Sequence, residues 1–225
     1  TTGKILNFIY STNLVRLGHT LFSRFLTVIN YHRINDVTPD FDSFRLNVSA
    51  TPSMFEEQMQ YLSRWFHVVS VEEVVLWLCG KANLPPHAAL ITFDDGYLDN
   101  YTNAYPILRK YNFPAVIFLT TGHINTDEPF YWDLAAYCFF HTTKSSVLFP
   151  DNTEKHWNNE REREFISNSW IESLKALPDA EKKKWVDELP TQLDARPPKG
   201  YFQNLMMNWN QVREMSRNGI EFGGH

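Results

Sequence analysis

The chain has 225 residues, of which 43% are hydrophobic and 15% aromatic, so it can bury one sizeable core and lacks the composition of a disordered protein. Its net charge of −5 and its pI near 5.9 argue against a nucleic acid as the main partner, because phosphate-binding surfaces carry clustered Lys and Arg. The basic run from Lys182 to Lys184 lies among acidic residues and is typical of a solvated helix face. We therefore expect a single globular domain over residues 1–225, and the composition leaves its oligomeric state open.

The first expected element is an amphipathic helix from Lys4 to Arg24, in which apolar residues recur at helical spacing with basic residues between them. Such a helix can lie on a membrane surface, although packing against its own domain is the favoured interpretation. No apolar stretch reaches the roughly 18 residues that a spanning helix needs. No signal peptide is visible either. Membrane association and cellular compartment are therefore left open.

The run Phe25–Ile34 predicts the first strand of the core. It is apolar at its start and ends in polar groups, among them His32. A lone histidine at such a place more often stabilises a strand end by hydrogen bonds than serves a reaction. Residues 35–50, rich in Asp, Pro, Ser and Asn, predict a loop that overhangs this end of the strand.

Two helices and a short strand are expected next. Thr51 or Ser53 can cap the first helix, because both precede an apolar stripe at helical spacing. The run Trp65–Ser70 predicts the strand, and the second helix begins at Ser70 and ends at Gly80.

The run Ala89–Phe93 is apolar and β-branched, and it breaks into two adjacent carboxylates, Asp94 and Asp95, before Gly96. Charges cannot be left inside a sheet, so the pattern predicts a buried parallel strand that ends at a functional site. A nucleotide-hydrolysing protein would also need a G-x-x-x-x-G-K-[ST] loop, which none of the nine glycines provides. A glycosidase carboxylate pair is disfavoured because neighbours on one strand point to opposite faces.

The pattern after Gly96 continues the alternation. Residues 97–111 are helical in pattern with Pro106 interrupting them, and Phe113–Gly122 predicts another strand. Strands and helices thus follow one another in turn from residue 25 to residue 122. This alternation indicates a parallel α/β sheet or barrel.

Residues 126–207 have a different pattern, with an aromatic helix that ends at His141 and two further helices around 165–177 and 180–193. The segment is too short and too polar to bury much by itself. We therefore expect an α-rich insertion on the core and no second domain. Trp132 in the aromatic helix would suit stacking on sugar rings, although aromatic residues at helical spacing more often belong to a core.

The last residues return to the core pattern, with a helix expected at 209–215 and a strand at 220–225. Three separate strands therefore end in side chains that can bind a metal or transfer a proton. These are His32, Asp94, Asp95 and His225. Metal-dependent amide hydrolysis needs a cation with a few oxygen and nitrogen ligands, a base for the water and an acid for the departing nitrogen. The four side chains together could meet this need.

The stretch Thr92-Phe93-Asp94-Asp95-Gly96 resembles the first motif of the polysaccharide deacetylases, the enzymes of carbohydrate esterase family 4 with a NodB-like domain. The stretch Asn218–His225 resembles the approach to their second motif, H-[ST]-x-x-H. Tyr31–Ile34 resembles the branch that deacetylates poly-N-acetylglucosamine, in which the motifs are circularly permuted. The resemblance implies a deformed (β/α) barrel of NodB type with an α-rich insertion at about 126–207.

In that family the first Asp of the motif acts as the base and the second binds the metal, which implies these roles for Asp94 and Asp95. His225 corresponds to the first histidine ligand, and His32 to the general acid. The implied activity is the hydrolysis of N-acetyl groups by a metal-dependent hydrolase, with zinc as the expected ion. Its implied partner is a polysaccharide that contains N-acetylglucosamine, and its implied location is the cell envelope or another extracytoplasmic site.

Tyr97 and Trp132 are the expected substrate contacts. The second histidine of the H-[ST]-x-x-H motif and the later motifs are absent, because the chain stops at His225. We therefore expect a truncated domain whose barrel is incomplete at its C-terminus. The alternative is a catalytically incompetent NodB-like fragment that only binds carbohydrate or a partner. The polymer and the identity of the metal are not predicted by these motifs.

Overall fold

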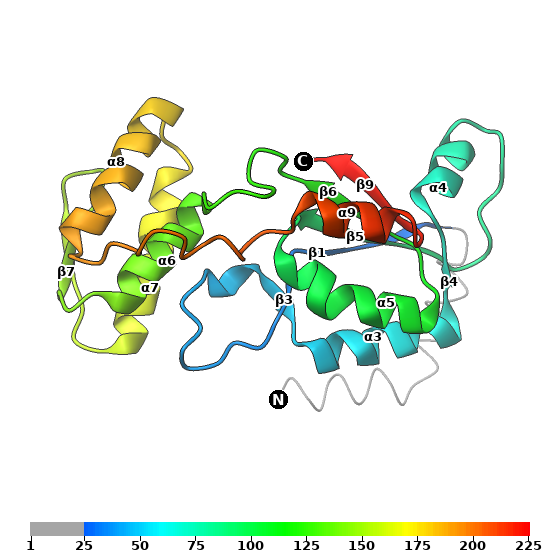
Figure 1. Cartoon of the computed structure of the whole chain (residues 1–225), viewed down its shortest axis with the longest axis horizontal. Helices are drawn as coiled ribbons and strands as arrows, with labels where there is room; N and C mark the ends of the chain where they lie inside the picture. Colours follow the sequence, from blue (N-terminus) through cyan, green and yellow to red (C-terminus); the bar gives the residue numbers. More distant parts are fainter. Residues whose placement is uncertain (1–24) are drawn as a thin grey trace. The chain divides into compact units, whose positions relative to one another are not determined.

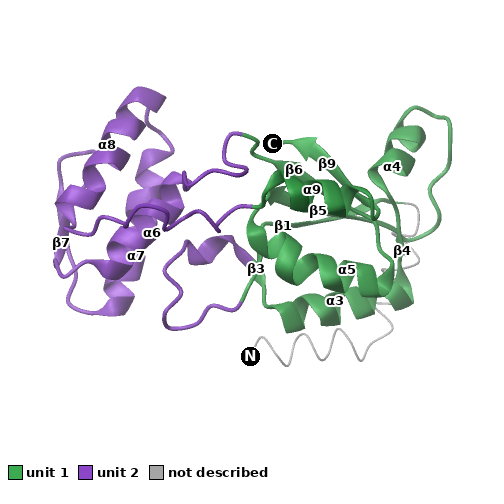
Figure 2. Cartoon of the chain, in the orientation of Figure 1, with its two compact units in different colours: residues 1–35, 49–121, 207–225 green, residues 36–48, 122–206 purple. Residues whose placement is uncertain are grey.

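The computed structural model describes residues 25–225, so the expected helix from Lys4 to Arg24 lies outside the described residues (Figure 1). The chain divides into two compact units (Figure 2). Unit 1 takes in the described residues up to Asn35 together with 49–121 and 207–225, and unit 2 comprises 36–48 and 122–206. Among the helices of the described part, none has the length and apolar character needed to cross a membrane.

Unit 1 is built on a five-stranded sheet in which every recorded strand pair is parallel. Four of its strands lie in the order β1 (Thr27–Tyr31), β5 (Ala88–Asp95), β6 (Ala115–Leu119) and β9 (Ile220–Gly224), and β4 (His67–Val68) also pairs with β5. The predicted parallel α/β sheet is confirmed. Over the described residues the sheet is open and does not close into a barrel.

Helices α3 (Pro52–Trp65), α4 (Val71–Leu78), α5 (Tyr105–Tyr111) and α9 (Trp209–Ser216) belong to the same unit (Figure 1). Helix α3 buries Phe55, Met59 and Leu62, the stripe expected from its helical spacing. Phe55 packs edge-on against Tyr31 of β1 at 5.0 Å and lies 5.8 Å from Phe93 of β5, between ring centroids. These aromatic contacts join the helix to the two strands that carry His32 and Asp94 near their ends.

Polar side chains determine where two of these helices begin. Thr51 caps α3 by accepting a hydrogen bond from the backbone N–H of Met54, with Pro52 in the first turn, so Ser53 does not serve as the cap. Ser70 caps α4 in a capping box with Glu73, as its sequence predicts.

We expect Ser70→Ala to lower the free energy of unfolding by about 1 kcal/mol, because the N–H of Glu73 loses its hydrogen-bond acceptor. Urea denaturation followed by circular dichroism measures the change. The matched control is Ser63→Ala, since Ser63 is an exposed residue inside α3 and caps no helix. A change at Ser63 as large as that at Ser70 would contradict the capping role.

The expected helix over residues 97–111 is divided in the structure. A π-helical turn, η2 (Asn100–Ala104), precedes α5, and Pro106 lies in the first turn of α5. Pro106 therefore lies where the π-helical turn passes into α5, and its missing N–H and its ring prevent a regular α-helical hydrogen-bond pattern from running through this point. π-Helical turns occur often at functional sites.

Unit 2 contains helices α6 (Tyr131–His141), α7 (Glu160–Leu174) and α8 (Asp179–Gln192), the hairpin of β7 (Ser146–Leu148) and β8 (Glu154–His156), and the short η1 (Arg45–Asn47). Two short strands, β2 (Arg33–Ile34) and β3 (Val48–Ala50), pair with each other where the chain passes between the units.

The second unit has a core of its own. The ring of Phe139 lies 5.7 Å from Trp157 and 6.4 Å from Trp170, and Trp170 is fully buried together with Leu174. The expectation that this segment would bury little by itself is therefore wrong. Its apolar residues are spread over three helices and a hairpin, and only the tertiary fold gathers them.

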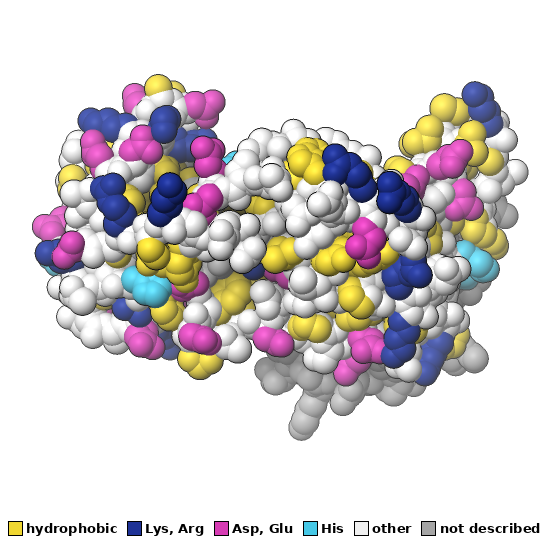
Figure 3. All heavy atoms as spheres, viewed as in Figure 1, with side chains coloured by type: hydrophobic (Ala, Val, Ile, Leu, Met, Phe, Trp, Pro, Cys, Tyr) yellow, Lys and Arg dark blue, Asp and Glu magenta, His cyan; other side chains and the backbone are white. Residues whose placement is uncertain are grey.

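Charged side chains of both signs are mixed on the face of the described chain that Figure 3 shows. The exposed pair of Lys183 with Asp187, at 3.1 Å, is one instance on α8. This agrees with the interpretation of the basic run around Lys183 as a solvated helix face.

Candidate functional site

The predicted site residues of unit 1 lie at the carboxyl ends of three parallel strands. His32 directly follows β1, Asp94 and Asp95 end β5, and His225 directly follows β9. Parallel strands present these ends at one edge of the sheet, where ligands of α/β folds are bound. The structure therefore brings together four residues that are as far as 193 positions apart in the sequence.

Asp94 faces β1. Its Oδ2 accepts a hydrogen bond of 2.7 Å from Nδ2 of Asn30 and lies 3.8 Å from Nε2 of His32. The Oδ1 of Asn30 accepts a hydrogen bond of 2.7 Å from the hydroxyl of Thr92. An ionised carboxylate can only accept, so the amide nitrogen of Asn30 must point to Asp94 and its oxygen to Thr92. Sequence analysis missed Asn30, whose only signal is a polar residue inside an apolar strand.

Asp95 faces β9. Its Oδ1 lies 3.5 Å from Nε2 of His225, and its side chain is 4% exposed whereas that of His225 is 47% exposed. Adjacent carboxylates on one strand thus have different neighbours. Asp94 is placed beside a side chain that can donate a proton, and Asp95 beside a second side chain that can bind a metal.

The backbone turns sharply at Asp95. The residue has φ +73°, and the N–H of Gly96 donates to the carbonyl oxygen of Asp94 at 2.9 Å, the hydrogen bond of a γ-turn. A positive φ at a residue other than glycine costs of order 1–3 kcal/mol and is found often at active sites. Gly96 follows with φ +87°, which only glycine adopts readily. Two consecutive residues with positive φ therefore separate β5 from the following helix.

The strand β9 approaches its neighbour closely just before His225. A Cβ added at Gly223 would lie 2.8 and 2.9 Å from Cδ1 and Cε1 of Phe118 on β6, so a larger residue would force the Phe118 ring to move. The N–H of His225 donates to the carbonyl oxygen of Leu119 at 3.0 Å. A glycine at 223 and this hydrogen bond hold His225 beside Asp95.

Tyr97 has no exposed surface, and the guanidinium carbon of Arg33 lies 4.5 Å from the centre of its ring. A fully buried side chain cannot contact a polysaccharide, so the expected substrate role of Tyr97 is corrected to packing beneath Arg33. The sequence does not distinguish the two roles, because an aromatic residue directly after the motif can face either the substrate or the core.

Trp132 lies in unit 2 at the start of α6 and is partly exposed. Its ring stacks on Phe130 at 4.5 Å and meets Tyr131 edge-on at 4.9 Å. These contacts fix the ring within its own unit. A contact between Trp132 and sugar remains a prediction.

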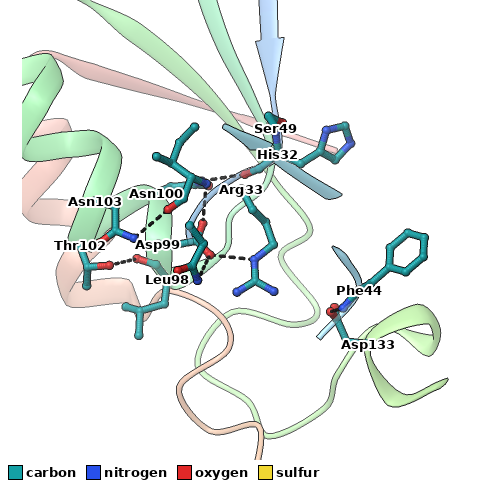
Figure 4. A network of polar contacts seen from close by, with 12 residues as sticks. His32, Arg33, Phe44, Ser49, Leu98, Asp99, Asn100, Thr102, Asn103 and Asp133 are labelled. Atoms are coloured by element: carbon teal, nitrogen blue, oxygen red, sulfur yellow. Dashed lines mark hydrogen bonds and ion pairs between the residues drawn. The ribbon is translucent and has the colours of Figure 1, made fainter. Parts of the chain in front are cut away.

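Figure 4 shows a buried network next to His32. Nε of Arg33 donates to Oδ2 of Asp99 at 2.7 Å, and the two side chains are 7% and 5% exposed. Burial raises the pKa of Asp99, and its attraction to Arg33 and its hydrogen bonds oppose that rise. This ion pair joins Arg33, which directly follows His32, to Asp99, which lies four residues after Asp95.

Two side chains of the candidate site have the donor types of a zinc site. A catalytic zinc site uses three protein ligands, for which carboxylate oxygen and imidazole nitrogen are both suitable. Asp95 and His225 are donors of these types and lie close together. Within residues 25–225 no group of three His, Cys, Asp or Glu side chains could hold a metal ion. The described residues thus supply two of the three protein ligands that a catalytic zinc site uses.

The chain is similar to proteins of one known family. The family described as polysaccharide deacetylase matches residues 81–225. A curated poly-beta-1,6-N-acetyl-D-glucosamine N-deacetylase from Staphylococcus aureus is 33% identical over 108 residues, which cover 44% of this chain and 37% of that protein. The enzyme of the same name from Staphylococcus epidermidis is 24% identical over 204 residues, which cover 87% of this chain and 70% of that protein.

A solved de-N-acetylase from Aggregatibacter actinomycetemcomitans is also similar, with a TM-score of 0.47 and 20% sequence identity over 89% of this chain and 54% of that chain. The segment that matches the Staphylococcus aureus deacetylase spans little more than a third of the length of that protein.

Proposed function

This chain belongs to the polysaccharide deacetylase family, and we propose on that premise that it hydrolyses N-acetyl groups of a polysaccharide containing N-acetylglucosamine. The observation that supports this most is the meeting of His32, Asp94, Asp95 and His225 at one edge of a parallel sheet. The substrate class is taken from the Staphylococcus relatives, whose name specifies poly-beta-1,6-N-acetyl-D-glucosamine.

In the proposed reaction Asp94 is the base. Its Oδ2 takes a proton from the attacking water, while the hydrogen bond from Asn30 keeps that oxygen in place. His32, 3.8 Å from the same oxygen, donates its proton to the departing amine. One proton is thus taken up at Asp94 and one is released at His32, and the products are acetate and a free amine.

A divalent cation, zinc in our proposal, would be held in part by Asp95 and His225 and would supply a Lewis acid for the acetamide carbonyl. The position of Asp95 suits this task, because its Oδ1 lies 3.5 Å from Nε2 of His225, so that an oxygen and a nitrogen donor stand side by side.

The proposed function is tested by incubating the zinc-loaded protein with β-1,6-linked N-acetylglucosamine oligomers. Acetate and free amine should appear in equal amounts. Saturable binding of the oligomer without acetate would instead support a domain that only binds carbohydrate.

We expect Asp95→Ala and His225→Ala each to weaken zinc binding by more than about 100-fold. Loss of a residue that only hydrogen-bonds to a metal ligand usually weakens binding by about 10- to 100-fold, and loss of a ligand itself should cost more. Isothermal titration with zinc measures this without any need for activity. The matched controls are Glu154→Ala and His156→Ala, because this exposed pair in the hairpin has similar residue types at a similar distance, 3.8 Å. Equal losses in both pairs would show that the zinc binds non-specifically.

A further inference from the structure

The short segment from His32 to Ile34 is held by side chains of the segment that follows β5 (Figure 4). The carbonyl oxygen of His32 accepts a hydrogen bond of 2.8 Å from Nδ2 of Asn100, and that of Ile34 accepts one of 2.7 Å from Nδ2 of Asn103. The N–H of Ile34 donates to Oδ1 of Asp99 at 3.2 Å. Backbone groups on both sides of Arg33 are therefore bonded to three side chains that lie within five residues of one another.

Much of this network is buried, and Asn103 is partly exposed. Asn100 has no exposed surface, and the ion pair between Asp99 and Arg33 is almost completely shielded from water. Hydrogen bonds in such surroundings are stronger than at the surface, and a broken one leaves a costly unsatisfied group. The segment of His32 is consequently held in one conformation.

The His32 side chain depends on this conformation. Its imidazole is 38% exposed and lies 3.8 Å from Oδ2 of Asp94, which is too far for a hydrogen bond. The position of the ring is therefore determined mainly through its backbone. The residues that hold that backbone begin at Asp99, four residues after Asp95. A single continuous stretch of chain thus carries the proposed base and places the proposed acid beside it.

We propose that Asp99, Asn100 and Asn103 are positioning residues that hold His32 where it can protonate the departing amine. The inference rests on the proposed deacetylase function. It predicts that variants of these residues lose the acid step and keep the other steps, since their recorded hydrogen bonds run to the backbone of the segment from His32 to Ile34.

The test compares two acetyl substrates. An N-acetylglucosamine oligomer has a leaving amine that must be protonated, whereas 4-nitrophenyl acetate has a leaving phenolate that needs no acid. We expect Asn100→Ala and Asn103→Ala to lower kcat for the oligomer by at least about tenfold at unchanged KM, approaching the loss expected for His32→Ala, about 10²–10⁴-fold. Hydrolysis of 4-nitrophenyl acetate should change less than about twofold.

The matched control is Thr102→Ala. Thr102 lies in the same turn and is exposed, and its hydroxyl bonds only the carbonyl oxygen of Leu98, at 3.4 Å, among the contacts recorded for the described residues. Both activities should stay unchanged in this variant. Equal losses on both substrates in Asn103→Ala, or no loss on either, would overturn the proposal.

A second measurement separates this proposal from the proposed function. The imidazole signals of His32 in proton–nitrogen correlation spectra should shift or broaden in Asn100→Ala and Asn103→Ala, and not in Thr102→Ala. If the unmodified protein releases no acetate from the oligomer but the signals respond in this way, the proposed function fails and the positioning of His32 stands. Unchanged His32 signals in both asparagine variants would refute the positioning role.

Discussion

Replacing Asp94 by Asn should lower acetate release from an N-acetylglucosamine oligomer by about 10²–10⁴-fold, the usual contribution of a general base. An amide of the same shape can still accept the hydrogen bond from Asn30, but it cannot take a proton from water. Initial rates of acetate formation at saturating oligomer measure the effect. Circular dichroism and the midpoint of urea denaturation should match those of the unmodified protein.

The neighbouring carboxylate provides the sharpest comparison for this variant. Zinc affinity should be preserved in Asp94→Asn and lost in Asp95→Ala, because only Asp95 lies beside His225. Asp151→Asn serves as the control for an exposed carboxylate, since Asp151 lies in an exposed turn where its Oδ1 accepts hydrogen bonds from the N–H and the hydroxyl of Thr153. If Asp94→Asn released acetate at the normal rate, Asp94 would not be the base. If it lost zinc instead, the roles of the two carboxylates would be reversed.

Replacing Asp99 by Leu should lower the free energy of unfolding by about 3–5 kcal/mol, the usual result of removing one partner of a buried ion pair. Arg33 would keep a buried charge, and the N–H of Ile34 would lose its acceptor. Equilibrium urea denaturation measures the change. This is the largest effect on stability that we expect from one substitution at the site.

The double variant Arg33→Met with Asp99→Leu should be more stable than Asp99→Leu alone, because it removes the uncompensated charge. Asp187→Ala is the control for an exposed ion pair and should leave the unfolding midpoint nearly unchanged. A double variant no more stable than the single one would show that Asp99 stabilises the fold mainly through its hydrogen bonds and not through its charge.

The helices and strands of unit 1 could be predicted because their signals are local. The spacing of Phe55, Met59 and Leu62 identified the buried face of α3, and the capping box at Ser70 identified the start of α4. Each of these signals depends on residues within one or two turns of the chain. Alternation of such elements then indicated a parallel sheet before any strand pairing was known.

Errors arose where burial depends on distant residues. Tyr97 was expected to contact substrate, but Arg33 from another strand covers its ring. Residues 126–207 were expected to bury little, but helices and a hairpin enclose Trp170 in a common core. A pattern along the chain shows which residues are apolar. It does not show which segments meet to exclude water from them.

Asp94, Asp95 and His225 could be singled out from the sequence because each stands where an apolar strand ends, and a charge or imidazole would otherwise lie inside the sheet. At the same kind of position His32 favours a structural role, and only the resemblance to the deacetylase family implies a catalytic one. Their partners were decided only by the tertiary structure. The strand order places β1 beside β5, so Asp94 meets Asn30 and His32, while Asp95 meets His225 at the end of β9. The pairing of β1 with β5 and the contact of Arg33 with Asp99 each join residues more than 60 positions apart. No local period of the sequence encodes such pairings.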